Sequence, residues 1–191
     1  MKARSKNDYG SLTVIWGSMY SGKSEELQRQ MDRAKYGGKK YQLFKPSKDN
    51  RYSEDDVVTH YGKGLKAQVV KDSFELLSKV DKDTTVIGID EGQFFDFGLI
   101  EVCKVLKRDF HVDIYISGLD MKFNGEPFPL MMELAAISNQ CTKFQAVCVK
   151  CGEDAYISHR LTDDDSDIVV GSNGVYVALC EKHHFEEKNK R

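Results

Sequence analysis

Short apolar segments alternate with amphipathic segments along the first three quarters of the chain. The runs at 12–16 and 84–90 are rich in β-branched residues and bounded by polar turns, which is typical of buried strands. Leu27, Met31 and Ala34 recur at helical spacing, and glycine follows at 37 and 38. The whole pattern predicts strands over 12–16, 41–44, 67–70, 84–90, 112–117 and 143–149. It predicts helices over 23–36, 74–80, 99–107 and 130–137, with Ser73 as the N-cap of the second helix.

This alternation of strands and helices predicts a parallel α/β sheet flanked by helices. Beyond residue 147 the pattern changes to short β segments and turns. We therefore expect a disordered N-terminal tail at 1–10, an α/β domain at 11–147, a small domain at 148–185 and a polar tail at 186–191. Residues 47–64 are polar and predict a long loop, of a length that is usually functional or disordered.

Composition limits the classes of protein to which the chain can belong. Its 191 residues suit one domain, or one domain with a small appendage, and 28 basic against 30 acidic residues give a net charge of −2. This balance excludes a uniformly basic nucleic-acid-binding protein. No apolar run approaches the roughly 20 residues of a membrane span, and the N-terminus has no apolar signal region. We therefore expect a cytoplasmic protein without membrane contact.

Residues 17–24 match the phosphate-binding pattern GxxxxGK[ST] without a mismatch. Its members are Gly17, Ser18, Met19, Tyr20, Ser21, Gly22, Lys23 and Ser24. The glycines allow successive backbone N–H groups to face phosphate oxygens, and the following helix adds its N-terminal dipole. Lys23 would reach the β- and γ-phosphates of ATP, and the Ser24 hydroxyl would bind Mg²⁺. A chance glycine-rich turn is disfavoured because the motif follows a predicted strand and begins a predicted helix.

Two carboxylates, Asp90 and Glu91, follow the buried strand at 84–90. Sites in open α/β sheets lie at the carboxyl ends of the strands, where the phosphate loop also lies. Asp90 is therefore the candidate for the Mg²⁺ shell and Glu91 the candidate general base. The alternative is a solvated acidic pair, which would be the better interpretation without the phosphate loop.

Two cysteine-containing pairs near the C-terminus indicate a metal site. Cys148 and Cys151 form CxxC, while Cys180 and His183 form CxxH. Two such pairs make a tetrahedral set for structural Zn²⁺, with no position left open for chemistry. The alternatives are a redox-active CxxC, four unrelated residues, or His184 as the fourth ligand. Cys103 and Cys141 are expected to be buried thiols.

The order and spacing of these motifs resemble those of the small, zinc-containing thymidine kinases of bacteria, animals and poxviruses. The resemblance runs from about residue 11 to residue 184. It rests on the phosphate loop, the two zinc pairs and three further segments: Asp-Glu-Gly-Gln-Phe-Phe at 90–95, Gly-Leu-Asp at 118–120 and Glu-Pro-Phe at 126–128. Lys122 departs from the acidic residue common at that position, which puts only the role of that position in question.

The resemblance implies transfer of the ATP γ-phosphate to the 5′-hydroxyl of thymidine. It implies a RecA-like phosphate-loop domain and a zinc-ribbon-like domain that carries a lasso loop over about 161–175. It also implies a homotetramer and feedback inhibition by thymidine triphosphate. Glu91 resembles the family's base and Arg51 a loop arginine near the transferred phosphate. The positions that match the thymidine site are Met19, Phe94, Leu119, Phe123, Arg160, Val169, Gly171 and Tyr176.

Two other functions compete with a nucleoside kinase that binds no nucleic acid. One is a RecA-like ATPase whose zinc module binds nucleic acid, in which Glu91 would activate water. The near-neutral charge disfavours it, because phosphate backbones need a basic face. The other is a non-catalytic nucleotide-binding regulator, which the intact set of Lys23, Ser24, Asp90 and Glu91 disfavours. Phe95 is expected to be a core residue.

Overall fold

Six parallel strands form the central sheet of the computed structural model, which describes residues 9–47, 56–58, 64–162 and 174–190. The strand order is β5-β2-β6-β7-β1-β8, and every neighbouring pair is parallel. The strands are β1 (Leu12–Gly17), β2 (Tyr41–Pro46), β5 (Gln68–Val70), β6 (Val86–Ile89), β7 (Asp113–Leu119) and β8 (Gln140–Phe144). The α/β class and the parallel sheet predicted from the sequence are confirmed.

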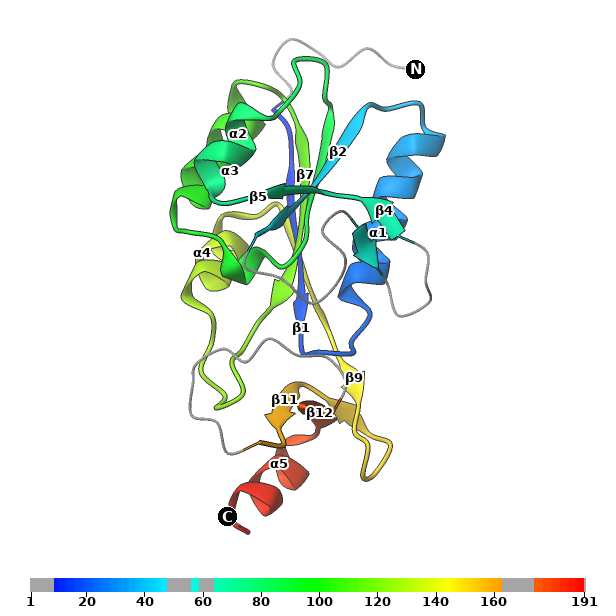
Figure 1. The fold of residues 1–191 in the computed structure, drawn as a ribbon, viewed down its shortest axis with the longest axis vertical. Coiled ribbons are helices and arrows are strands. Elements are labelled where there is room, and N and C mark those ends of the chain that lie inside the picture. Colours follow the sequence, from blue (N-terminus) through cyan, green and yellow to red (C-terminus); the bar gives the residue numbers. More distant parts are fainter. Residues whose placement is uncertain (1–8, 48–55, 59–63, 163–173, 191) are drawn as a thin grey trace.

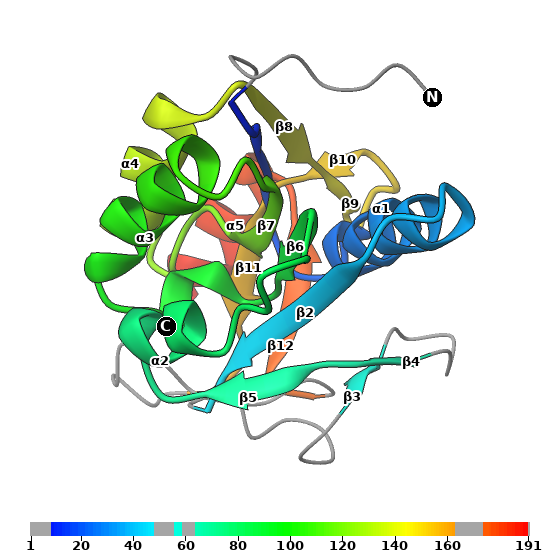
Figure 2. The ribbon, with the colours of Figure 1, turned by 90° about the horizontal axis from the view of Figure 1, so that it is seen from above.

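Helices cover both faces of this sheet (Figures 1 and 2). Helix α1 (Lys23–Tyr36) packs on one face, and α2 (Ser73–Ser78), α3 (Gly98–Arg108) and α4 (Pro129–Ile137) lie on the other. Side chains alternate along a strand, so neighbouring residues of β6 serve different layers. Ile87 and Ile89 join the core beneath α2–α4, whereas Val86 packs toward α1. Both faces of the strand are therefore buried, as a parallel sheet requires.

The edge strand β8 shows where the apolar pattern misleads. The sequence predicts one strand over 143–149, but β8 covers Gln140–Phe144 and a separate β9 covers Ala146–Val147. The first four residues of β8 are exposed, so polar residues occupy a true sheet strand. The chain then leaves the sheet, because β9 pairs antiparallel with β10 (Asp154–Ala155).

Two smaller predictions are also wrong. The N-cap of α2 is Asp72 and not Ser73: the Asp72 side chain accepts from the Glu75 N–H at 2.8 Å. The predicted loop over 47–64 contains the short strand β3 (Asp56–Val58), which pairs with β4 (Gly64–Lys66). Arg51 lies outside the described residues.

A C-terminal unit, here residues 146–162 and 174–190, lies at the carboxyl ends of the strands (Figure 1). It contains β9, β10, β11 (Ile157–Arg160), β12 (Tyr176–Leu179) and α5 (Glu181–Lys188). Its buried core is small: Ala146, Cys148, Ala155, Ala178 and Leu179. Such a core is typical of units that need a metal to fold.

Each predicted tail includes residues that belong to the folded part of the protein. Helix α5 continues to Lys188, so half of the predicted polar tail at 186–191 is helical. Gly10 is buried and its N–H donates to the Lys107 carbonyl at 2.8 Å, so Gly10 belongs to the α/β domain. Among the described residues, no helix is both long and apolar enough to cross a bilayer.

The N-cap of α2 provides a test of local structure. Replacing Asp72 by Ala should lower the free energy of unfolding by about 1 kcal/mol, because the Glu75 N–H loses its acceptor. Asp72→Asn keeps a side-chain oxygen and should retain most of the stability. Urea unfolding of the three proteins measures this. Equal stability of the Ala and Asn variants would contradict the assignment of the cap.

Candidate active site and metal centre

The phosphate loop joins β1 to α1 in a conformation that depends on its glycines. Gly17 has φ 149°, and a Cβ there would lie 2.1 Å from the Phe144 carbonyl oxygen of β8. Gly22 has φ 83° and is the last residue before α1. Lys23 folds back, and its Nζ donates to the Ser18 carbonyl at 2.6 Å. The loop thus ends at a helix N-terminus, the arrangement that binds phosphate groups.

The first half of the phosphate loop is attached to the C-terminal unit. The Ser18 hydroxyl donates to the Ala155 carbonyl at 3.2 Å, and the Met19 N–H donates to the Ser158 hydroxyl at 2.9 Å. Ser18 and Ser158 are both buried. The Met19 N–H is therefore bonded to the C-terminal unit. The N–H groups later in the loop, next to α1, are the ones placed to bind phosphate. Sequence patterns gave no indication of these contacts.

Asp90 connects three segments at the end of the sheet. Asp90 is 7% exposed, and its carboxylate accepts from the Ser117 hydroxyl near the end of β7 and from the Glu91 N–H at 3.0 Å. The Ser24 hydroxyl, at the start of α1, lies 3.4 Å from the same carboxylate. Hydroxyl and carboxylate oxygens are the donor set that Mg²⁺ prefers, so Ser24 and Asp90 fit a magnesium site.

Glu91 occupies a conformation that is uncommon for a residue with a side chain. Its φ is 52°, in the left-handed region, and it precedes a short 3₁₀ turn, η1 (Gly92–Phe94). Its carboxylate accepts from the Gln93 amide nitrogen, and the Gln93 amide oxygen accepts from the Leu119 N–H at 2.9 Å. Such strained positions cluster at functional sites.

Ser117 and Gln93 are site residues that sequence reasoning missed. The register pairs Ile89 with Ile116, so continuing it by one residue places Ser117 beside Asp90. That signal exists only once the strand order is known. Gln93 lies two residues after Glu91, but nothing in the sequence shows that the chain turns there.

Arg160 contacts two aromatic residues of the predicted thymidine site, Phe123 and Tyr176. The Arg160 guanidinium carbon lies 3.6 Å from the centroid of the Phe123 ring. Arg160 Nε and Nη2 donate to the Tyr176 hydroxyl at 3.2 and 2.9 Å. The Tyr20 hydroxyl in turn donates to the Tyr176 backbone carbonyl at 3.3 Å. The structure thus brings together the phosphate loop, β11, β12 and the loop after β7.

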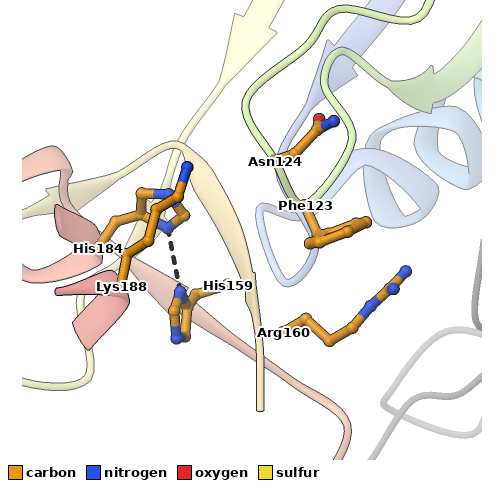
Figure 3. A pocket seen from close by; sticks show the side chains of 6 residues that line it. All are labelled: Phe123, Asn124, His159, Arg160, His184 and Lys188. Atoms are coloured by element: carbon orange, nitrogen blue, oxygen red, sulfur yellow. Dashed lines mark hydrogen bonds between the residues drawn. The ribbon is translucent and has the colours of Figure 1, made fainter. Parts of the chain in front are cut away.

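A cavity of about 160 Å³ lies beside this arginine (Figure 3). It is lined by Phe123, Asn124, His159, Arg160, His184 and Lys188. The buried rings of His159 and His184 meet across one side, with their Nδ1 atoms 3.0 Å apart. Burial, then the neighbouring His159 and Lys188, lowers the pKa of His184. Among the described residues, the predicted thymidine site shares Phe123 and Arg160 with this cavity.

The other predicted site residues are placed as follows. Met19, Phe94 and Leu119 are half-buried near the carboxyl ends of β1, β6 and β7. Phe95 belongs to the hydrophobic core, as expected. Lys122 Nζ lies 3.6 Å from the Glu126 carboxylate within its own loop. Val169 and Gly171 lie outside the described residues.

The four predicted metal ligands form one cluster. The ligand atoms of Cys148, Cys151, Cys180 and His183 all lie within 4.8 Å of one another. Cys151 and Cys180 sulfurs are 3.8 Å apart, and His183 Nδ1 is 3.5 and 3.2 Å from the Cys148 and Cys180 sulfurs. Tetrahedral Zn²⁺ with Zn–S bonds of about 2.3 Å needs sulfurs about 3.8 Å apart. The cluster therefore fits zinc, and His184 instead faces His159.

Electrostatics also suit a metal at this cluster. Burial opposes ionisation of Cys148, but hydrogen bonds from the backbone N–H groups of Cys180, Lys150 and Cys151 outweigh it and lower its pKa to about 6. A thiolate is the form that binds zinc. Lys150, between the two cysteines of the first pair, bonds to Glu187 of α5 and ties that turn to the helix. Contrary to expectation, Cys141 is exposed, whereas Cys103 is buried.

Comparisons with known proteins identify the family of this chain. The family model described as "Thymidine kinase" matches residues 10–184. The chain belongs to the thymidine kinase family. The thymidine kinase of Bacteroides thetaiotaomicron is 42% identical over 184 residues, which cover 95% of this chain and 90% of that protein. The thymidine kinase of Bacteroides fragilis is 44% identical over 176 residues, covering 91% and 86%. The family predicted from the motifs is confirmed.

Metal content tests the cysteine–histidine cluster. Purified protein should contain about one zinc per chain by mass spectrometry, because the four ligands complete a tetrahedral site. Cys151→Ser should lower the zinc content and the temperature of unfolding. Cys141→Ser, an exposed cysteine outside the cluster, should change neither. Zinc-free native protein, or a Cys151→Ser variant with unchanged zinc and stability, would refute the site.

Proposed function

We propose that the protein transfers the γ-phosphoryl group of ATP to the 5′-hydroxyl of thymidine, giving thymidine monophosphate and ADP. The chain belongs to the thymidine kinase family, and one structural observation supports this proposal. The phosphate loop and the Asp90–Glu91 pair meet at one edge of the sheet, with Ser24 Oγ 3.4 Å from the Asp90 carboxylate. A donor nucleotide and an acceptor hydroxyl can meet at this edge.

In the proposed reaction, the 5′-oxygen attacks the γ-phosphorus, the bond to the β-phosphate oxygen breaks, and ADP leaves. Glu91 accepts the proton of the 5′-hydroxyl. Lys23 and the N–H groups at the start of α1 hold the phosphate oxygens and offset their charge. Such transfer depends on positioning and charge stabilisation more than on covalent help from the protein.

Ser24 and Asp90 are the proposed magnesium ligands. When bound, Mg²⁺ would neutralise charge on the phosphates of the nucleotide. The hydrogen bonds from Ser117 and the Glu91 N–H orient the Asp90 carboxylate toward Ser24. These residues would therefore hold the metal without rearrangement of the sheet.

The acceptor site is proposed to lie between the loop after β7 and the C-terminal unit. Its described walls are Met19, Phe94, Leu119, Phe123 and Tyr176. Arg160 supports Phe123 and Tyr176, because it stacks on the Phe123 ring and donates to the Tyr176 hydroxyl. Arg51, Val169 and Gly171 enter the proposal through the family resemblance alone. So do the homotetramer and inhibition by thymidine triphosphate.

A nucleic-acid-dependent ATPase is not favoured. The family match spans residues 10–184, and the net charge of −2 provides no general attraction for a phosphate backbone. Incubation with labelled ATP and thymidine, with and without single-stranded DNA, separates the two functions. Thymidine monophosphate is the expected product, and DNA-stimulated hydrolysis without it would support the ATPase instead.

Glu91→Gln tests the proposed base. The variant should bind ATP normally and lose about 10²–10⁴-fold in kcat, because the amide cannot accept the hydroxyl proton. Glu101→Gln, on the exposed face of α3, should match the wild type. Steady-state kinetics with direct ATP titration measure both effects. Near-normal turnover of Glu91→Gln would exclude Glu91 as the base.

Arg160→Lys tests the aromatic walls. An ammonium group cannot both stack on Phe123 and donate two bonds to Tyr176, so the KM for thymidine should rise about tenfold. The KM for ATP should change less than about twofold. Tyr176→Phe, which removes only the hydroxyl, should give a smaller rise. An unchanged thymidine KM in Arg160→Lys would contradict this role.

A further inference from the structure

Gln93 occupies a central place at the proposed site, although its side chain belongs to none of the functions assigned above. It lies in the 3₁₀ turn after Glu91 and is 7% exposed. Its amide joins two groups from different strands: the Leu119 N–H at the end of β7 and the Glu91 carboxylate after β6. A buried amide with both ends bonded is a rigid connection.

The chemistry of its two partners fixes the direction of this amide. A backbone N–H can only donate, so the group facing Leu119 must be the amide oxygen. The amide nitrogen then faces Glu91, where an ionised carboxylate can only accept. In the reversed orientation, the amide NH₂ group would face the Leu119 N–H, and the amide oxygen would face the Glu91 carboxylate. Gln93 therefore presents one N–H group to the carboxylate in one orientation.

Gly118 leaves the room that this amide needs, and Gly92 lets the turn lie against Ile116. A Cβ at Gly118 would lie 2.7 Å from the Gln93 amide oxygen and 2.9 Å from the sulfur of Met131. A Cβ at Gly92 would lie 2.6 Å from Ile116. The left-handed φ of Glu91 then places the carboxylate and the amide within bonding distance across the turn.

We infer that Gln93 is a positioning residue that aims the Glu91 carboxylate at the acceptor hydroxyl. By bonding also to Leu119, it fixes the distance between the base and one wall of the acceptor pocket. This inference rests on the proposed function. The effect on rate arises because a small misplacement of a reacting group can reduce turnover about a hundredfold.

The test uses the full-length protein and two variants. Gln93→Met keeps the length of the side chain and removes both bonds. Gln93→Glu keeps an acceptor for the Leu119 N–H and loses the donor to Glu91. Each should lower kcat 10- to 100-fold, on the order expected for a displaced catalytic group, with the KM for ATP and thymidine within about threefold. Gln140→Met, on the exposed edge strand β8, is the matched control and should match the wild type.

A second measurement separates positioning from general structural support. In the Glu91→Gln background, Gln93→Met should cost less than about threefold further, because the group it positions is already disabled. Full multiplication of the two losses, or unchanged kcat in both single variants, would overturn the inference. If Gln93→Met fails to fold, Gln93→Glu carries the same comparison. Absence of thymidine monophosphate from the wild type would instead refute the proposed function.

Discussion

The buried carboxylate of Asp90 is the interaction on which the arrangement of the site depends. Removing a charged group from water is costly unless hydrogen bonds replace the lost solvent. The Ser117 hydroxyl and the Glu91 N–H bond to it, and the Ser24 hydroxyl lies close by. These partners come from the end of β7, the end of β6 and the start of α1. Satisfying one buried charge therefore aligns the phosphate loop with the strand that carries the candidate base.

The C-terminal unit completes the site from the opposite side. Its backbone and Ser158 hold the phosphate loop, while Arg160 donates to Tyr176 beside the proposed acceptor pocket. The unit has a small core of its own, and the cysteine–histidine cluster lies within it. A metal bound at this cluster would thus stabilise a unit that contacts both the phosphate loop and the proposed acceptor pocket.

Local sequence patterns predicted the parts of the molecule that depend on nearby residues. The phosphate loop, the acidic strand end and the start of α1 at Lys23 follow from short motifs, and the candidate metal ligands follow from two spaced pairs. The exposed edge strand β8 escaped prediction because it lacks an apolar pattern. Ser117, Gln93 and Ser158 escaped because their roles arise from contacts across the sheet or between units, which periodicity does not encode. The Asp72 cap was missed because two adjacent residues suit that position.

In the proposed reaction, Glu91 meets the acceptor hydroxyl beside the phosphate loop. A structure of the protein with thymidine and a non-hydrolysable ATP analogue tests it most directly. We expect a Glu91 carboxylate oxygen about 2.6–3.2 Å from the 5′-hydroxyl, with the γ-phosphate at Lys23 on the other side of that hydroxyl. Thymidine bound with its 5′-hydroxyl beyond the reach of Glu91, or a nucleotide bound away from residues 17–24, would contradict it.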